Sequence, residues 1–134
     1  MNFESITLPL EKDDVAPDGS EIRLLPRMSR GSLSHCTLPV SVTSVAVSHR
    51  SIEEIWYVLS GQGQLWRKLG QQEEVVSLAS GVSVTIPPET HFQFRNVGDQ
   101  PLCILITTMP PWPGPEEAMA IEGYWKEASK DQTT

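Results

Sequence analysis

Two side chains of this sequence have types and spacing suited to proton transfer. His49 and Glu54 lie in the segment 47–61, which reads VSHRSIEEIWYVLSG. An imidazole titrates near neutral pH and can take up or release a proton, and a nearby carboxyl group can act as its partner. His49 and Glu54 are therefore our candidate catalytic residues.

The positions around them follow the alternation of β-strands, in which residues i and i+2 share one face. Glu53 and Glu54 are adjacent, so only one of these two carboxylates can point inward. Three rows of same-face residues result, namely Val47 and His49, then Glu54, Trp56 and Val58, then Phe92, Phe94 and Asn96.

Short apolar runs punctuated by turn residues must position these side chains. Eleven prolines and nine glycines separate runs rich in Val, Ile, Thr and aromatic residues, a pattern typical of an all-β sandwich or barrel. We predict strands at 21–25, 33–38, 42–49, 54–60, 63–69, 73–78, 82–86, 91–96 and 102–108. So many strands in one segment indicate a closed or double-sheet architecture.

The length of 134 residues suits one domain with its own core. We divide it into an acidic N-terminal arm at 1–20, a β-barrel at 21–108 and a C-terminal tail at 109–134. The tail is rich in proline and tryptophan, and 116–121 could form one or two helical turns. Its aromatic residues Trp112, Tyr124 and Trp125 should pack on the barrel or on a partner subunit.

Charge and composition exclude some function classes. The net charge of −7 provides no basic face for phosphate, so nucleic acid is not an expected partner. No segment resembles a signal peptide or a membrane span, so we expect a cytoplasmic protein. Cys36 and Cys103 lack CxxC spacing and should be reduced, buried thiols.

Two motifs resemble those of the cupin superfamily. His49, Glu54 and Gly61 reproduce the spacing of the end of the first cupin motif, and the second motif fits the segment 81–96, GVSVTIPPETHFQFRN, at Gly81, Pro87 and Asn96. The resemblance covers about residues 33–108 and implies a small double-stranded jelly-roll barrel.

The resemblance also implies a metal inside the barrel, held by two histidines and a glutamate from the first motif and one histidine from the second. Those ligand positions fall on Val47, His49, Glu54 and Phe92, so two of the four are apolar. The three rows would then face the interior, around an apolar pocket lined by Val47, Trp56, Val58, Phe92, Phe94 and Asn96.

Inside such a pocket, a carboxylate must be paired, hydrogen-bonded or protonated. We therefore predict that Glu54 hydrogen-bonds His49, directly or through one water. If they pair, the carboxylate should raise the pKa of His49, an effect that burial opposes. A purely structural His–Glu pair is the alternative.

Three functions remain open. The first is a small-molecule-binding cupin with no metal or other cofactor, in which His49 and Glu54 catalyse isomerisation, epimerisation, cyclisation or elimination. The second is an oxygenase-like enzyme that holds Fe, Mn, Ni or Zn with His49, Glu54 and either His91 or His35. The third is a ligand-binding protein without catalysis.

The second function requires His91 or His35 to face the metal position. His91 precedes the expected ligand position by one residue and should point away from it unless the preceding loop bulges. The alternation around His35 does not determine which face of its strand is inward. We also expect a homodimer, because barrels of this kind leave strand edges for a twin subunit to cover.

Overall fold

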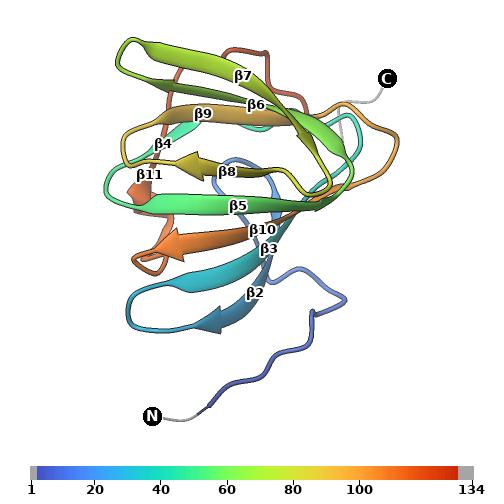
Figure 1. Cartoon of the computed structure of the whole chain (residues 1–134), viewed down its shortest axis with the longest axis vertical. Coiled ribbons are helices and arrows are strands. Elements are labelled where there is room, and N and C mark those ends of the chain that lie inside the picture. The colour runs from blue at the N-terminus through green and yellow to red at the C-terminus, as the bar shows by residue number, and fades with distance from the viewer. Residues whose placement is uncertain (1–2, 130–134) are drawn as a thin grey trace.

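The computed structural model describes residues 3–129 of the chain. Within that range, eleven strands form two antiparallel sheets that face each other (Figure 1). The six-stranded sheet has the order β1 (Asp14–Val15), β2 (Glu21–Arg27), β3 (Ser32–Leu38), β10 (Leu102–Met109), β5 (Glu53–Ser60) and β8 (Ser83–Ile86). The five-stranded sheet has the order β11 (Ala118–Ala120), β4 (Val47–His49), β9 (His91–Asn96), β6 (Gln62–Leu69) and β7 (Gln72–Ala79).

The predicted all-β jelly-roll architecture is confirmed, with two local differences. Of the expected strand 42–49 only Val47–His49 is regular, while the preceding residues attach to β9 through single backbone bonds such as Ser44 N–H to Phe94 C=O. The expected helical turns of the tail shrink to a 3₁₀ turn, Pro115–Glu117. The residues after it pair with the free edge of β4 as β11, which satisfies backbone groups on both strands.

The strands have the sequence alternation that a two-sheet barrel requires. Along β5 the side chains of Glu54, Trp56 and Val58 are buried and their neighbours are exposed. Trp56 contacts two rings of β9 edge-on, with centroid distances of 5.8 Å to Phe92 and 4.9 Å to Phe94. These contacts join the two sheets across the core.

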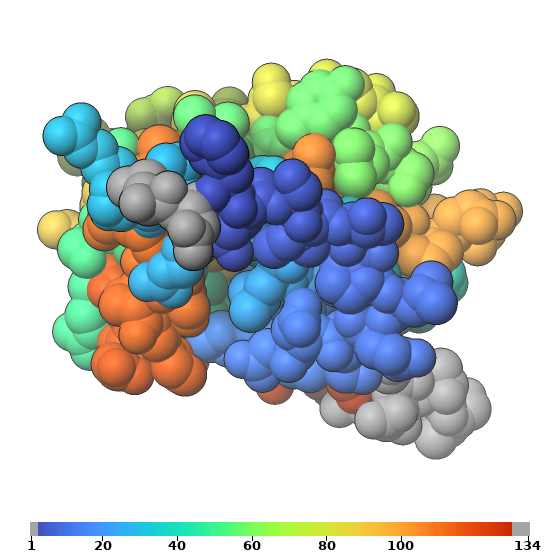
Figure 2. Space-filling view, turned by 90° about the horizontal axis from the view of Figure 1, so that it is seen from below, coloured from blue at the N-terminus to red at the C-terminus, as the bar shows by residue number. Residues whose placement is uncertain are grey.

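The N-terminal segment and the last described residues of the tail pack on the outside of the barrel. Arg23 on β2 donates hydrogen bonds to the carbonyl oxygens of Pro9 and Leu10, which hold the N-terminal segment against that strand (Figure 2). On the five-stranded sheet, Tyr124 stacks on Trp66 and the guanidinium of Arg95 lies 4.4 Å from the ring of Trp125.

The outer face of β5 carries an exposed apolar row of Ile55, Tyr57 and Leu59. This row could support the predicted homodimer, which stays a prediction. No helix of residues 3–129 is long and apolar enough to cross a membrane.

The β5–β6 turn yields a first prediction on stability. Gly61 has φ of +91°, and an added Cβ would lie 2.6 Å from the Pro101 carbonyl oxygen, whereas Gly70 has φ of +61° with open space around it. We expect Gly61→Ala to lower the free energy of unfolding by about 3 kcal/mol, because strain and overlap add, and Gly70→Ala by only about 1 kcal/mol. Urea unfolding of both variants measures the difference, and equal losses would contradict it.

Candidate functional site

A cavity of about 640 Å³ lies inside the barrel and takes its walls from both sheets and from the tail. Five of the residues predicted for the site line it, namely Val47, His49, Glu54, Trp56 and Phe92. Thr108 on β10 and Trp112 on the tail line it as well. The cavity thus combines an aromatic wall with a small number of polar groups, as small-molecule sites do.

The pocket prediction is corrected at Val58, Phe94 and Asn96, which do not line this cavity. Val58 and Phe94 are fully buried in the core, where facing side chains leave no space. The amide of Asn96 donates to the carbonyl oxygens of Leu38 and Gln100, so its role is to hold backbone.

Glu54 is a buried carboxyl group with neutral donors on both of its oxygens. Its Oε1 accepts from the indole N–H of Trp56 at 3.0 Å and its Oε2 from the hydroxyl of Thr108 at 3.3 Å. Burial raises the pKa of Glu54 to about 7, with an added contribution from the charge of Asp18, although both hydrogen bonds oppose the rise. Glu54 therefore exchanges its proton near neutral pH.

His49 is a buried and neutral imidazole. Its ring contacts Phe92 and Trp112 edge-on at centroid distances of 5.2 and 5.4 Å, and its Nδ1 has no hydrogen-bond partner. Burial lowers the pKa of His49 to about 4, and the charge of Glu117 only partly offsets this. At neutral pH His49 is therefore a neutral imidazole, which can accept a proton but cannot act as an imidazolium acid.

The direct form of the predicted hydrogen bond between His49 and Glu54 was wrong, and the form through one water stays a prediction. The Glu54 carboxyl group accepts from Trp56 and Thr108, and among the described residues no direct hydrogen bond joins it to His49. Burial lowers the pKa of His49 overall, and the carboxylate that raises it in part is Glu117, not Glu54.

The donors needed for a metal do not converge. Across residues 3–129 no three His, Cys, Asp or Glu side chains are grouped so that they could hold an ion. Val47 and Phe92, at the two other ligand positions implied by the resemblance, present apolar side chains to the cavity. The residues present do not fit a four-ligand metal centre.

Neither His91 nor His35 can complete the alternative metal set with His49 and Glu54. His91 is exposed on β9, beside the inward-facing Phe92. His35 on β3 is buried, lies in register with Arg23 of β2 and does not line the cavity. Alternation with the inward Phe92 places His91 outside the cavity as well.

The tail is fastened beside the cavity by Glu117. Its carboxylate accepts hydrogen bonds from the backbone N–H of Ser51, from the Ser51 hydroxyl at 2.9 Å and from the N–H of Ile52 at 2.8 Å. Burial favours a higher pKa for Glu117, but these donors and His49 hold it below its usual value. The same tail segment carries Trp112, which packs on His49.

Asp18 is a second acidic group of the cavity that the sequence did not indicate. It lies in the turn before β2, where its Oδ1 accepts from the N–H of Ser20 at 2.9 Å and from the Ser20 hydroxyl at 2.6 Å. Burial raises its pKa, although these hydrogen bonds act in the opposite direction. The sequence Pro17-Asp18-Gly19 is typical of a turn, which is why it gave no sign of a cavity residue.

Thr108 was also missed, although the sequence contains its signal. It continues the inward row of Ile104 and Ile106 along β10, two residues farther on. A polar residue at the end of an apolar row indicates a polar place in the interior.

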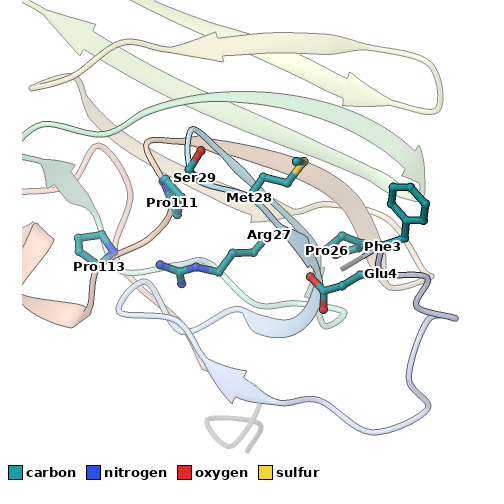
Figure 3. A pocket seen from close by; sticks show the side chains of 8 residues that line it. All are labelled: Phe3, Glu4, Pro26, Arg27, Met28, Ser29, Pro111 and Pro113. Atoms are coloured by element: carbon teal, nitrogen blue, oxygen red, sulfur yellow. The ribbon is translucent and has the colours of Figure 1, made fainter. Parts of the chain in front are cut away.

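An outer groove of about 780 Å³ adjoins the cavity (Figure 3). It lies between the N-terminal segment, the β2–β3 turn and the prolines of the tail, and it shares Glu4 and Arg27 with the cavity. These two residues of opposite charge therefore stand at the rim between the cavity and its approach.

Comparison with known proteins agrees with this architecture. Residues 34–108 match the family described as cupin domain. The uncharacterized protein MJ1618 of Methanocaldococcus jannaschii is 33% identical over 106 residues, which cover 75% of this chain and 82% of that protein.

Solved structures show the same fold at lower identity. An uncharacterized conserved protein with a double-stranded beta-helix domain from Klebsiella pneumoniae has a TM-score of 0.64 and 15% identity, over 78% of this chain and 85% of that one. Oxalate decarboxylase from Bacillus subtilis has a TM-score of 0.69 and 13% identity, over 82% of this chain and 30% of that one.

The opposite pKa shifts of His49 and Glu54 predict compensating effects of pH on stability. The pKa of His49 falls from 6.5 to about 4 on folding. Its contribution to the free energy of unfolding is therefore complete above pH 6.5 and is lost as the pH falls toward 4. The pKa of Glu54 rises from 4.5 to about 7, so its contribution is complete below pH 4.5 and is lost as the pH rises toward 7. Each amounts to about 3 kcal/mol, and between pH 4.5 and 6.5 they largely cancel.

Single substitutions should reveal each contribution. Relative to the parent, Glu54→Gln should lose stability as the pH falls from 7 to 4.5, and His49→Gln should gain stability over the same interval. Urea unfolding across this pH range measures both slopes, with the exposed pair Glu53→Gln and His91→Gln as matched controls. Parallel profiles for all four variants would contradict the shifts.

Proposed function

The chain belongs to the cupin domain family, and from this premise we propose that its barrel binds a small molecule and that His49 and Glu54 transfer a proton on it without a metal. The reaction would be an isomerisation, epimerisation, cyclisation or elimination, each of which needs a base that removes a proton and an acid that returns one. The single observation that carries the proposal is that both side chains line one aromatic cavity.

The two residues suit different roles. His49 is neutral and its ring borders the cavity, so it can act as the base. Glu54 has a pKa of about 7 and can donate a proton at neutral pH. Pairs of titratable groups whose surroundings shift their pKa values in opposite directions are a recurring feature of acid–base sites.

The remaining wall residues support this chemistry. Trp56 and Thr108 hold the Glu54 carboxyl group in one orientation through their hydrogen bonds. Phe92 and Trp112 enclose the His49 ring and limit the water around it. A fixed, poorly solvated acid and base exchange protons with a ligand more readily than with bulk solvent.

A generic proton-abstraction reaction tests the proposal without knowledge of the substrate. With 5-nitrobenzisoxazole, a base removes the proton on C3 while the N–O bond breaks, and the product is a coloured cyanophenolate. We expect the protein to accelerate this elimination at neutral pH, and we expect His49→Gln to lower the rate by about tenfold or more.

The exposed His91→Gln is the matched control and should retain the parent rate. If the parent is no faster than buffer, or if His49→Gln matches the parent, proton transfer by His49 is refuted. Binding of the probe without turnover would instead favour a ligand-binding protein without catalysis.

Metal content provides a separate prediction. Purified without chelators, the protein should contain well under one equivalent of Fe, Mn, Ni, Zn or Cu, because only two of the four implied donors are present. If the parent protein contains a stoichiometric metal that is lost in His49→Ala, the proposal of a metal-free site is overturned.

Restoring the two missing donors should create a metal site. Val47 lies opposite Phe92 where β4 pairs with β9, and the Phe92 ring already contacts His49. We therefore expect the double variant Val47→His/Phe92→His to bind Ni²⁺ in calorimetric titrations and the parent to bind none. A folded double variant that binds no better than the parent would show that the inward register is wrong.

A further inference from the structure

We infer that the cavity recognises a small organic ammonium ion, whose charged group lies against Asp18 and Glu54 and whose apolar part packs on the aromatic wall. The inference rests on the proposed function for the location of the ligand and adds its chemical class. It is carried by the charges, hydrogen bonds and rings that line the cavity.

The cavity is acidic and lacks an internal cation. Its lining includes the acidic residues Glu4, Asp14, Asp18 and Glu54, and the basic residue Arg27. Arg27 lies at the rim, where the outer groove begins. The ion pair between Arg67 and Glu74 lies away from the cavity, since neither residue lines it.

The two inner carboxyl groups retain acceptor capacity toward the cavity. Asp18 accepts both bonds from Ser20 on Oδ1 alone, and its side chain lines the cavity. Each oxygen of Glu54 receives one bond from a neutral donor. A carboxylate removed from water is costly unless it is paired, and an ammonium group brings one positive charge and three N–H donors.

Asp18 and Glu54 act on the same region of the cavity. The charge of Asp18 raises the pKa of Glu54, and both carboxyl groups raise the pKa of the buried Cys36 thiol beyond the rise that burial alone causes. Both residues line the same cavity, so a cation bound in it is attracted by both carboxyl groups.

The wall favours an organic cation over a bare metal ion. The rings of Trp56, Phe92 and Trp112 line the cavity, and a cation is attracted to aromatic faces. Hard metal ions require six or more oxygen ligands, which this wall does not supply. His49 is neutral and adds no repulsion.

An anion is the competing occupant, because Arg27 projects into the outer groove (Figure 3). Arg27 is exposed and shares the rim with Glu4, so its charge is screened by water and offset by a carboxylate. Glu54 is buried and Asp18 is partly buried, so water screens these two groups less than Arg27, and the field inside the cavity therefore favours a cation.

Three probes of one shape separate these occupants. Benzylammonium, benzyl alcohol and benzoate share the same ring and differ in charge. In calorimetric titrations at neutral pH we expect benzylammonium to bind about tenfold tighter than benzyl alcohol, because its hydrogen bonds are charge-assisted, and benzoate to bind weakest.

The variant Asp18→Asn keeps the shape of the side chain and its bonds to Ser20 but removes the charge. It should reduce the preference for benzylammonium over benzyl alcohol to about twofold or less and leave the affinity for the alcohol unchanged. The exposed Asp99→Asn is the matched control and should keep the parent preference.

Equal binding of the ammonium and the alcohol, tighter binding of benzoate, no binding of any probe, or an unchanged preference in Asp18→Asn would each overturn the inference. Its failure is distinct from failure of the proposed chemistry, since 5-nitrobenzisoxazole is uncharged. If the protein turns over 5-nitrobenzisoxazole but does not prefer benzylammonium, only the inference on the ligand class fails. If it prefers benzylammonium but does not turn over 5-nitrobenzisoxazole, only the proposed proton transfer fails.

Discussion

Val47 lies opposite Phe92 where β4 pairs with β9, and this register decides which side chains enter the barrel. Because strand neighbours alternate, an inward Phe92 sends His91 out to solvent. The ring of Phe92 then contacts both His49 and Trp56, and so it connects the base of the site to the aromatic wall. A shift of one residue in this pairing would replace an apolar wall with an imidazole and change the chemistry of the cavity.

Burial acts on His49 and Glu54 in opposite senses and brings both toward the uncharged state. It lowers the pKa of His49 and raises that of Glu54. The structure therefore avoids a buried ion pair, which would have to recover the desolvation cost of two charges. Polar groups without net charge can instead coexist with an aromatic wall.

Patterns of local origin were predictable from the sequence, and contacts between distant segments were not. Alternation along β5 and the turn residues around it predicted the strands, and the resemblance to the cupin motif implied that Glu54 is the inward carboxylate. The partners of Glu54 were not predicted, because a strand pattern gives the face of a residue but not what faces it from β10. Asp18 and Glu117 belong to irregular segments that have no periodicity, and their roles depend on where a turn and a tail settle on the barrel.

The strand β5 is nearly as apolar on its outer face as on its inner one. Outward Glu53, Ile55 and Tyr57 mirror inward Glu54, Trp56 and Val58, so a slip of one residue would exchange one acidic-apolar row for another. Hydrophobic burial by itself hardly discriminates between these two registers. The register of β5 is therefore determined by its pairing with β10 and by the tightly packed turn at Gly61, whose patterns are less symmetric. A β5 strand paired one residue out of register would therefore bring Tyr57 into the cavity in place of a tryptophan.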